Sequence, residues 1–529
     1  MATDTNMMGQ TGLLAAIERA GNRLPDPVFL FVYLILGLIV ISVLCAWLGV
    51  NAAHPVLRDT EGAAVMVQAT SLLSAENVAR FWVEMPKTFT HFHPLGYVLV
   101  VMLGAGVAER SGFFGASIRA AVRHAPAALL TPVVAAVAML SNHAADAGYV
   151  ILIPVAAIIY VSAGRHPLAG VACAFAGVSG GFSANITPGA LDALLFGITE
   201  AAVDGSGLAA GWTVNIAGNW WFIVALMALY LPIVWWVTDR IIEPRLGAWA
   251  PDVVEDLQAE VSGETDQGLQ TRGLKRAGWA ALAVIALWLW MVFGPGTPLL
   301  NDDQAAEGLA WYQKAAPLFG SLVAGFMVLF LATGWAYGSV AGTIRSSQDL
   351  IDMLTESMKD MGYYLVLAFT AAHFVAMFNW SNLGLIMAVH GANAIQASGL
   401  PLAVLLGLIV LFSGLLNLFV GSASAKWALL APVLVPLLML LGISPEGATA
   451  AYRVGDSATN MITPLMVYFP LVLIFARRWQ RDFGLGSLTA MMLPYAVWML
   501  ISGIALVMLW IGMGWDFGPG AAMSFELQS

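Results

Sequence analysis

A chain of 529 residues in which 60% of residues are hydrophobic and only 10% are charged differs from soluble domains, where about 25% of residues are charged. Most of such a chain has to face lipid or the interior of a helix bundle, so the composition excludes a soluble domain and predicts an all-α polytopic membrane protein. The net charge of −10 and the lack of a basic stripe argue against nucleic-acid binding.

The first 26 residues contain no apolar segment of the kind that signal peptides carry, and we expect residues 1–26 to be cytoplasmic. Nine later segments are apolar over about 20 residues, the length that crosses a bilayer as a helix. They are 27–50, 95–119, 168–200, 216–238, 277–297, 317–338, 361–380, 447–477 and 485–513. The sequence therefore predicts about nine transmembrane helices.

Two further apolar segments, 126–162 and 402–442, are each interrupted by a polar tip, at 141–146 and 421–427. Each segment forms either two spans joined by a tight turn or a hairpin that enters and leaves on the same side. Non-helical backbone at membrane depth is tolerated only where it is buried in protein or lines a wet cavity. The polar tips therefore favour two re-entrant hairpins.

The positions of the basic residues predict the orientation. With both hairpins re-entrant, most Lys and Arg residues fall on one side, and Arg58, Arg80, Lys87 and Lys314 fall on the other. The positive-inside rule makes the first side cytoplasmic. Two full spans in place of each hairpin would leave the following segments on the same sides of the membrane, so the charge rule alone does not exclude that version. We expect a multi-pass protein of the bacterial inner membrane with a cytoplasmic N-terminus, an external loop at 51–93, a cytoplasmic linker at 239–276, an interfacial segment at 345–360 and an external C-terminal tail at 514–529.

The two halves of the chain repeat the same order of features. In each half a hairpin is followed by a span that contains Asn, Thr and Pro, and the separations between matched positions are nearly constant. The matched pairs are Pro154 with Pro436, Pro167 with Pro445, Asn185 with Asn460, Thr187 with Thr463, and Pro188 with Pro464. An extra span at 277–297 makes the second copy start from the opposite side. The sequence thus predicts inverted repeats at 27–238 and 317–513, with binding sites near the midplane.

Both spans that follow the hairpins contain helix-disrupting residues. Pro leaves a backbone carbonyl unpaired, and Gly and Asn tolerate non-helical dihedral angles, so 177–185 and 455–460 are predicted to unwind. Unwound carbonyls and side-chain oxygens suit Na⁺, whereas half-helix N-termini suit a substrate carboxylate. Simple proline kinks are the alternative. We expect the coupling-ion site at Asn185, Thr187, Asn460 and Thr463, with Na⁺ at Asn185 and Asn460, and part of the substrate site at Ser141 and Asn142.

Charged residues inside a membrane cost at least about 2.5–3.5 kcal/mol each, so each one needs a reason. Asp192 follows Pro188 by four residues, and Arg453 and Asp456 are three apart on one helical face. Arg453 is predicted to bind an anionic substrate group, because a guanidinium bonds a carboxylate through two hydrogen bonds. Asp192 or Asp456 would carry the coupling proton or help to hold a cation. An ion pair between Arg453 and Asp456 that only stabilises the bundle is the alternative.

Several other residues are weaker candidates. Asp146 and Lys426 lie in the two tips, and Trp427 would either stack on an aromatic substrate or pack. His143 and His373 could titrate near neutral pH, and His143 is the stronger candidate because it lies in a tip. The chain contains no Walker A or HExxH motif, and no Gly-x-Ser-x-Gly nucleophile elbow is expected. We therefore predict that it is not an enzyme. Cys45 and Cys173 have no Cys or His at metal spacing and are expected to be small buried residues.

Specific segments of the sequence match those of a known family. They are 21–27, 141–148, 185–189 and the stretch from 425 to 464. Through them the chain resembles the p-aminobenzoyl-glutamate transporter (AbgT) family over nearly its full length. The resemblance implies a homodimer of protomers with nine helices and two hairpins, and uptake of p-aminobenzoyl-glutamate or export of sulfonamide antimetabolites. The positions that match the family's functional residues are Asp192, Trp427, Pro445, Arg453, Asp456 and Pro464.

The combined prediction is a secondary active transporter that is driven by a proton or sodium gradient through alternating access. Its substrates would be aromatic carboxylates, sulfonamides or both. A cation-coupled dicarboxylate carrier is the alternative, because Arg453 would serve it equally well, whereas Trp427 favours an aromatic ligand. An ion channel is less favoured because matched helix breaks indicate a closed midplane site and slow, saturable turnover. No cofactor other than a bound Na⁺ is expected. The sequence does not give the direction of transport.

Overall fold

The computed structural model describes residues 26–527 apart from the internal positions 59–62, 124–125, 127–128, 145–147, 210–211, 214, 248, 250–266, 295, 302–310 and 464–465. The predicted cytoplasmic segment 1–26, apart from Asp26, therefore lies outside the described residues, as do residues 248 and 250–266 of the predicted linker 239–276, Asp146 and Pro464.

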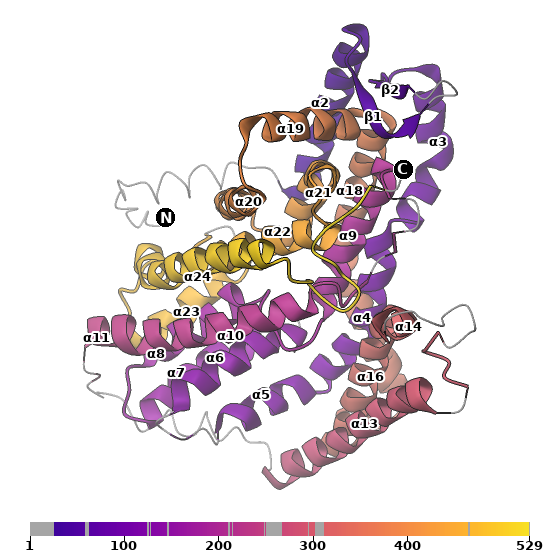
Figure 1. The fold of residues 1–529 in the computed structure, drawn as a ribbon. Coiled ribbons are helices and arrows are strands. Elements are labelled where there is room, and N and C mark those ends of the chain that lie inside the picture. Colours follow the sequence, from indigo (N-terminus) through magenta and orange to yellow (C-terminus); the bar gives the residue numbers. More distant parts are fainter. Residues whose placement is uncertain are drawn as a thin grey trace, which may run out of the picture.

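Helices dominate the described chain, as predicted for an all-α membrane protein (Figure 1). Eight described helices are long and apolar enough to cross a membrane. Seven coincide with predicted spans, and the eighth, α21, is one arm of the second predicted hairpin. The eight are α2 (Pro27–Trp47), α3 with α4 (Ala75–Arg110), α10 to α11 (Trp220–Leu246), α13 (counted over Gly268–Phe293), α16 (Leu322–Ala341), α18 (Gly362–Trp380), α21 (Ala423–Leu440) and α24 (Leu485–Met513). The total number of spans and the re-entry of the hairpins stay predictions.

Each predicted hairpin consists of two helical arms that meet near the expected tip. The first contains α6 (Leu130–Leu140), a 3₁₀ turn (Ser141–Ala144), a π-helical turn (Gly148–Leu152) and α7 (Ile153–Ser162). The second contains α20 (Leu402–Asn417) and α21. A Cβ at Gly148 would meet Ser141 Oγ at 2.2 Å, so the close approach at the first tip requires glycine.

The two spans that follow the hairpins are interrupted, as expected. The first runs through α8 (Pro167–Phe175), the π-helical turn η4 (Ala176–Gly180), the non-helical segment 181–189 and α9 (Ala190–Ser206). The second consists of α22 (Pro445–Asn460) and α23 (Phe469–Trp479).

The prediction that 455–460 unwinds is wrong, because α22 stays helical to Asn460. Gly455 serves close packing there: a Cβ at this position would meet the Val410 carbonyl oxygen of α20 at 2.0 Å. The first prediction, for 177–185, is correct only from Gly181 onward, since the chain is helical up to Gly180.

Helix α22 lies at the centre of the bundle, in contact with α9, α20, α21 and α24 (Figure 1). Every residue from Pro445 to Thr459 is buried. Because this helix is polar as well as buried, its charged side chains have to find partners inside the protein.

The predicted external loop 51–93 is folded rather than irregular. It contains the antiparallel strands β1 (Asn51–Arg58) and β2 (Ala64–Gln68) followed by α3 (Ala75–Thr90). Helix α19 (Leu383–Ser398), which the sequence analysis missed, packs beside β1, and His390 Nε2 lies 3.0 Å from the Asn51 carbonyl oxygen. Its polar positions, such as His390 and Asn393, keep it below the hydropathy of a span.

The remaining elements complete the bundle. The predicted interfacial segment 345–360 forms the amphipathic helix α17 (Ser347–Asp360), which begins with a capping box between Ser346 and Asp349. The described C-terminal residues run back over the end of α22, where Ile443 and Ser524 form an antiparallel bridge. The other helices are α4 (His93–Arg110), α5 (Phe113–Arg123), α10 (Trp220–Val237), a π-helical turn (Thr238–Ile242), α11 (Glu243–Leu246), α13 (Gln267–Phe293), α14 (Trp311–Lys314) and α15 (Ala316–Gly320).

Candidate functional site

A buried ion pair joins the two interrupted spans. Arg453 Nη1 donates to Asp192 Oδ1 at 2.7 Å, with side-chain exposures of 2% and 6%. Asp192 also caps its own helix, because its Oδ2 accepts from the Gly189 amide at 2.8 Å. Arg453 Nε has no hydrogen-bond partner among the described residues. The guanidinium therefore keeps an unused donor in the centre of the protein.

A second buried ion pair lies one helical turn further along α22. The Lys426 ammonium donates to the Asp456 carboxylate and to Asn417 Oδ1, and the side chains of the pair are 0% and 2% exposed. Asn417 in turn donates to the Asp456 carbonyl oxygen at 2.8 Å. The second hairpin and α22 are thus held together by a lysine, an aspartate and an amide.

These contacts exclude the alternative that Arg453 pairs with Asp456 in the described conformation. Each residue has a different partner, on α9 for Arg453 and on α21 for Asp456. The i, i+3 spacing placed both on one face correctly but gave no information about the charges on neighbouring helices.

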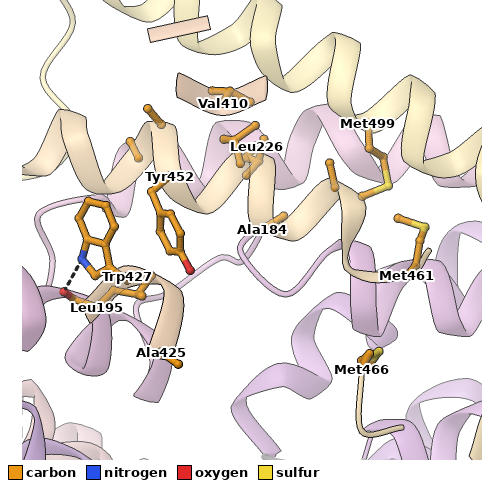
Figure 2. Packing of buried hydrophobic residues seen from close by; sticks show 14 of the residues in the cluster. Ala184, Leu195, Leu226, Val410, Ala425, Trp427, Tyr452, Met461, Met466 and Met499 are labelled. Atoms are coloured by element: carbon orange, nitrogen blue, oxygen red, sulfur yellow. Dashed lines mark hydrogen bonds between the residues drawn. The ribbon is translucent and has the colours of Figure 1, made fainter. Parts of the chain in front are cut away.

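Two aromatic rings, those of Trp427 and Tyr452, pack together beside the residues of the two ion pairs, and Figure 2 shows these rings. Trp427 is fully buried and stacks on Tyr452, with ring centroids 4.6 Å apart. The Trp427 indole donates to the Leu195 carbonyl oxygen at 3.2 Å and to Thr199 Oγ1 at 3.0 Å. The Tyr452 hydroxyl lies 3.2 Å from Asp456 Oδ2. Trp427 thus has a complete packing role in this conformation.

The first helix break packs directly against the end of α22. Ser457 Oγ donates to the Gly180 carbonyl oxygen at 2.6 Å and accepts from the Ser183 amide at 3.3 Å. Asn460 Nδ2 lies 3.5 Å from the Ser179 carbonyl oxygen. The structure therefore brings Asn460 to the edge of the first break, whereas Thr463 Oγ1 donates within its own segment to the Thr459 carbonyl oxygen at 3.0 Å.

The first hairpin tip contacts the same break from its other side. His143 Nε2 lies 3.1 Å from Thr187 Oγ1, and Asn185 Nδ2 donates to the Met139 carbonyl oxygen at 3.3 Å. Ser141 and Asn142 donate to carbonyl oxygens at the end of α6, at 2.7 Å and 3.0 Å. The hydrogens of both tip side chains are used locally, so their predicted contact with substrate stays a prediction.

Of the two candidate prolines, the structure describes Pro445 but not Pro464. Pro445 is the first residue of α22, after the N-cap Ser444, a position where its missing amide hydrogen leaves no bond unmade. Pro464 lies outside the described residues.

The remaining candidates are His373 and the two cysteines, and the structure shows how each is packed. His373 Nδ1 lies 2.7 Å from the Phe369 carbonyl oxygen, and its ring packs against Phe369 and Phe81. Cys173 is buried as expected, whereas Cys45 is only half-buried.

The segment Gly177–Gly181 matches the Gly-x-Ser-x-Gly spacing of a hydrolase nucleophile elbow. Ser179, however, is fully buried in a π-helical turn, and its Oγ lies 3.4 Å from Met466 Sδ. A nucleophile elbow needs an exposed Ser on a strand-to-helix turn, so this segment does not form one.

A cleft of about 700 Å³ opens between α3, α9 and α18. Its polar lining includes Arg80, Lys87 and Asp204, and Arg80 lies over the Trp380 ring at 4.8 Å. Phe92 separates this cleft from a cavity of about 20 Å³ beside Ser424 and Ala428. The cleft therefore leads toward the helix that carries Lys426 and Trp427.

A bundle of membrane-length helices with buried ion pairs at two interrupted spans defines a multi-pass membrane transporter. The chain belongs to the AbgT putative transporter family, whose model matches residues 12–525. It is 36% identical over 506 residues to the p-aminobenzoyl-glutamate transport protein of Escherichia coli strain K12, covering 95% of each chain. The resemblance predicted from the sequence is thereby confirmed.

Two solved structures have the same fold. The YdaH transporter of Alcanivorax borkumensis is 42% identical with a TM-score of 0.85, covering 94% of this chain and all of that one. MtrF of Neisseria gonorrhoeae, described within a class of antimetabolite efflux pumps, is 38% identical with a TM-score of 0.88, covering 98% of this chain and all of that one.

Three site residues escaped the sequence analysis: Thr199, Asn417 and Ser457. All three are ordinary polar residues in predicted spans or hairpin arms, and only the tertiary structure shows that they contact Trp427, Lys426 and the first break. No local sequence signal separates them from Ser and Thr residues that bond to their own helix.

Proposed function

We propose that this protein is a secondary active transporter of anionic aromatic compounds, namely p-aminobenzoyl-glutamate-like carboxylates, sulfonamide antimetabolites or both. The observation that carries the proposal is the buried Arg453–Asp192 pair, which links α22 to α9. A buried charge pair adds little to stability compared with apolar packing, so its place at the meeting point of two interrupted spans is better explained by function.

Arg453 is proposed as the group that recognises the substrate. Its Nη1 is bonded to Asp192, and its Nε is unpaired among the described residues. A substrate carboxylate or sulfonamide anion would accept from the free edge of the guanidinium, which is the geometry that arginine offers to planar anions. Trp427 and Tyr452 would provide the apolar wall for an aryl ring once the site opens.

A cation would compensate the substrate's charge. In the described conformation Asp192 and Asp456 are already neutralised by Arg453 and Lys426. An anion that binds to Arg453 leaves excess negative charge in a buried site, which favours simultaneous uptake of a proton or Na⁺. Oxygens of Asn185, Thr187, Asn460 and Thr463, with the carbonyls of the non-helical segment 181–189, are of the type that would hold Na⁺.

The cleft between α3, α9 and α18 is proposed as the external route to the site. Under the predicted topology this cleft opens on the outer side, and it approaches the second hairpin through Phe92. Its volume of about 700 Å³ falls within the range of small-molecule sites. We further propose that this is an inner-membrane protein with a cytoplasmic N-terminus, that it works by alternating access and that it forms a homodimer. Native mass spectrometry of the detergent-solubilised protein would test the homodimer.

Counterflow in proteoliposomes tests the function. Labelled p-aminobenzoyl-glutamate is exchanged against internal substrate with and without a sulfonamide competitor, with and without Na⁺, and across a pH step. Saturable exchange that the sulfonamide inhibits supports a carrier with an aromatic site. The ion dependence of driven uptake or extrusion then names the coupling cation.

A cation-coupled dicarboxylate carrier remains the second candidate, since Arg453 offers the same contact to aliphatic diacids. Exchange of an aliphatic dicarboxylate in the absence of any exchange of the aromatic substrate would favour it. Large unitary currents in planar bilayers would instead favour the less supported ion channel.

A further inference from the structure

Glu446 is a buried acidic residue for which the described part of the chain provides no cationic partner. It is the second residue of α22 and is 4% exposed. The Trp212 indole and the Ser444 hydroxyl lie beside its carboxyl group. The backbone at Gly218 is so close that a Cβ there would meet Glu446 Cγ at 2.9 Å. Among the described residues no Lys, Arg or His forms an ion pair with it.

This environment differs from that of Asp192 and Asp456, the two acidic residues that form the buried ion pairs of the candidate site. Asp192 and Asp456 each have a basic partner within the bundle, which favours their ionised forms. Burial without a cation favours the protonated form of Glu446. Its place in the first turn of a helix favours the ionised form, because the N-terminal end of the helix dipole is positive. These opposing effects make Glu446 a group that can exchange its proton.

Glu446 belongs to the same polar face of α22 as the proposed site. Positions 446, 449, 453 and 456 follow the three- and four-residue spacing of one helical face. Thr449 Oγ1 lies 3.0 Å from Thr199 Oγ1, which accepts from the Trp427 indole. Along the helix axis Glu446 is about 10 Å from Arg453. The carboxyl group therefore lies on the same helical face as the substrate site without being part of it.

The C-terminal segment packs against the residues that precede α22 and against Asn215. Ser444 donates its amide to the Met523 carbonyl oxygen at 3.0 Å, and Phe525 donates its amide to the Gly442 carbonyl oxygen at 2.9 Å. Asn215 Nδ2 donates to the Pro519 carbonyl oxygen at 2.6 Å, so the C-terminal segment 514–527 and the segment before α10 close over this region. Displacement of this cover would expose the carboxyl group to water.

The charged groups on the elements around Glu446 are either bonded to other residues or exposed. Arg453 is bonded to Asp192, and Glu200 of α9 is bonded to His93. Asp516, on the covering segment, is exposed. Arg453 is the basic group among these three, and it forms no ion pair with Glu446 in the described part of the chain. The protonation of Glu446 is therefore governed by burial and by the helix end.

We propose that Glu446 is the residue that binds and releases the coupling proton, an inference that rests on the proposed transport function. Its carboxylate takes a proton from the aqueous phase on one side of the membrane and releases that proton to the other side. One proton thus crosses in each cycle. The exchange of substrate at Arg453 is a separate step that does not require this proton to move.

The test compares Glu446→Gln with Asp516→Asn, which neutralises an exposed carboxylate on the covering segment. Both full-length proteins are reconstituted, and counterflow without a gradient is measured beside accumulation or extrusion driven by a pH gradient. Glu446→Gln is expected to lower gradient-driven transport at least about tenfold more than counterflow, and Asp516→Asn is expected to lower neither. Equal pH-driven transport by Glu446→Gln and the wild type would overturn the proposal, as would wild-type transport that only a Na⁺ gradient drives.

A second readout does not depend on the substrate. Infrared difference spectra recorded across a pH titration of the purified protein are expected to show the C=O band of a protonated carboxyl group that is missing from Glu446→Gln. The same band in both proteins would overturn the assignment. If the wild type shows this band but exchanges no aromatic substrate, the proposed function fails and the proton site stands. Should Glu446→Gln not fold, Glu446→Asp keeps the carboxyl group and is expected to retain the band.

Discussion

Replacement of Asp192 by Asn removes the carboxylate that neutralises Arg453 and keeps a side-chain oxygen that can still accept from the Gly189 amide. The variant therefore isolates the charge from the helix cap, which Asp192→Ala would also delete. Because Arg453 is 2% exposed in its side chain, water cannot replace the missing partner, and the guanidinium is left buried and unpaired.

The expected cost follows from this burial. Removal of one partner from a buried ion pair destabilises a protein by about 3–5 kcal/mol. In Asp192→Ala, loss of the side-chain acceptor for the Gly189 amide adds about 1 kcal/mol. Arg453→Gln leaves Asp192 unpaired, and its expected loss of stability falls in the same range. In the double variant Asp192→Asn/Arg453→Gln neither charge remains, so most of the lost stability should return.

A double-mutant cycle on the detergent-solubilised protein measures this coupling. Unfolding free energies of the wild type, both single variants and the double variant are compared in mixed micelles, and counterflow is measured on the same proteins. We expect a coupling energy of at least about 1 kcal/mol, with transport lost in all three variants, the stable double variant included. Additive destabilisation would refute the reasoning about the pair, and transport by the double variant would refute its functional role.

Three further predictions follow from other contacts. Gly455→Ala should weaken the packing of α22 on α20 by about 1–3 kcal/mol, since its Cβ would meet the Val410 carbonyl oxygen at 2.0 Å. Gly278→Ala on α13, where a Cβ would meet no atom of the described residues within 4 Å, should have no such effect on the unfolding temperature. Trp427→Leu should raise KM for aromatic substrates more than for aliphatic diacids, and equal effects would indicate a packing role. Burial lowers the pKa of His166 below 6.5, with Glu243 opposing the shift. The unfolded chain then binds more protons just below pH 6.5, so stability should fall as the pH drops through this value. His166→Asn, which keeps the cap on the Leu168 amide, should reduce this dependence, and an unchanged pH profile of the unfolding temperature would contradict the assignment.

The spans and the two interrupted helices were predictable because they follow from apolar length and from proline and glycine placement. The same reasoning failed at Gly455, where glycine allows a close helix contact instead of an unwound segment. Local sequence cannot separate these two uses of glycine, because the deciding atom belongs to α20.

Arg453, Asp192, Lys426 and Asp456 stood out because charges are rare in membrane spans. Their pairing could not be predicted, since it joins residues that are as much as 261 positions apart. The fold of 51–93 and helix α19 were missed for a related reason: they are stabilised by contacts with one another, such as that of Asn382 Nδ2 with the Gln68 carbonyl oxygen at 2.9 Å, and their own hydropathy is low.

Equilibrium binding of labelled p-aminobenzoyl-glutamate to the purified protein tests the central claim most directly. The wild type and Arg453→Gln are compared, and Arg345→Gln, at an exposed arginine, serves as the control. We predict saturable binding to the wild type and to the control, displacement by a sulfonamide, and at least about a tenfold loss of affinity in Arg453→Gln. Equal affinity of Arg453→Gln and the wild type would contradict the assignment of the buried guanidinium as the substrate site.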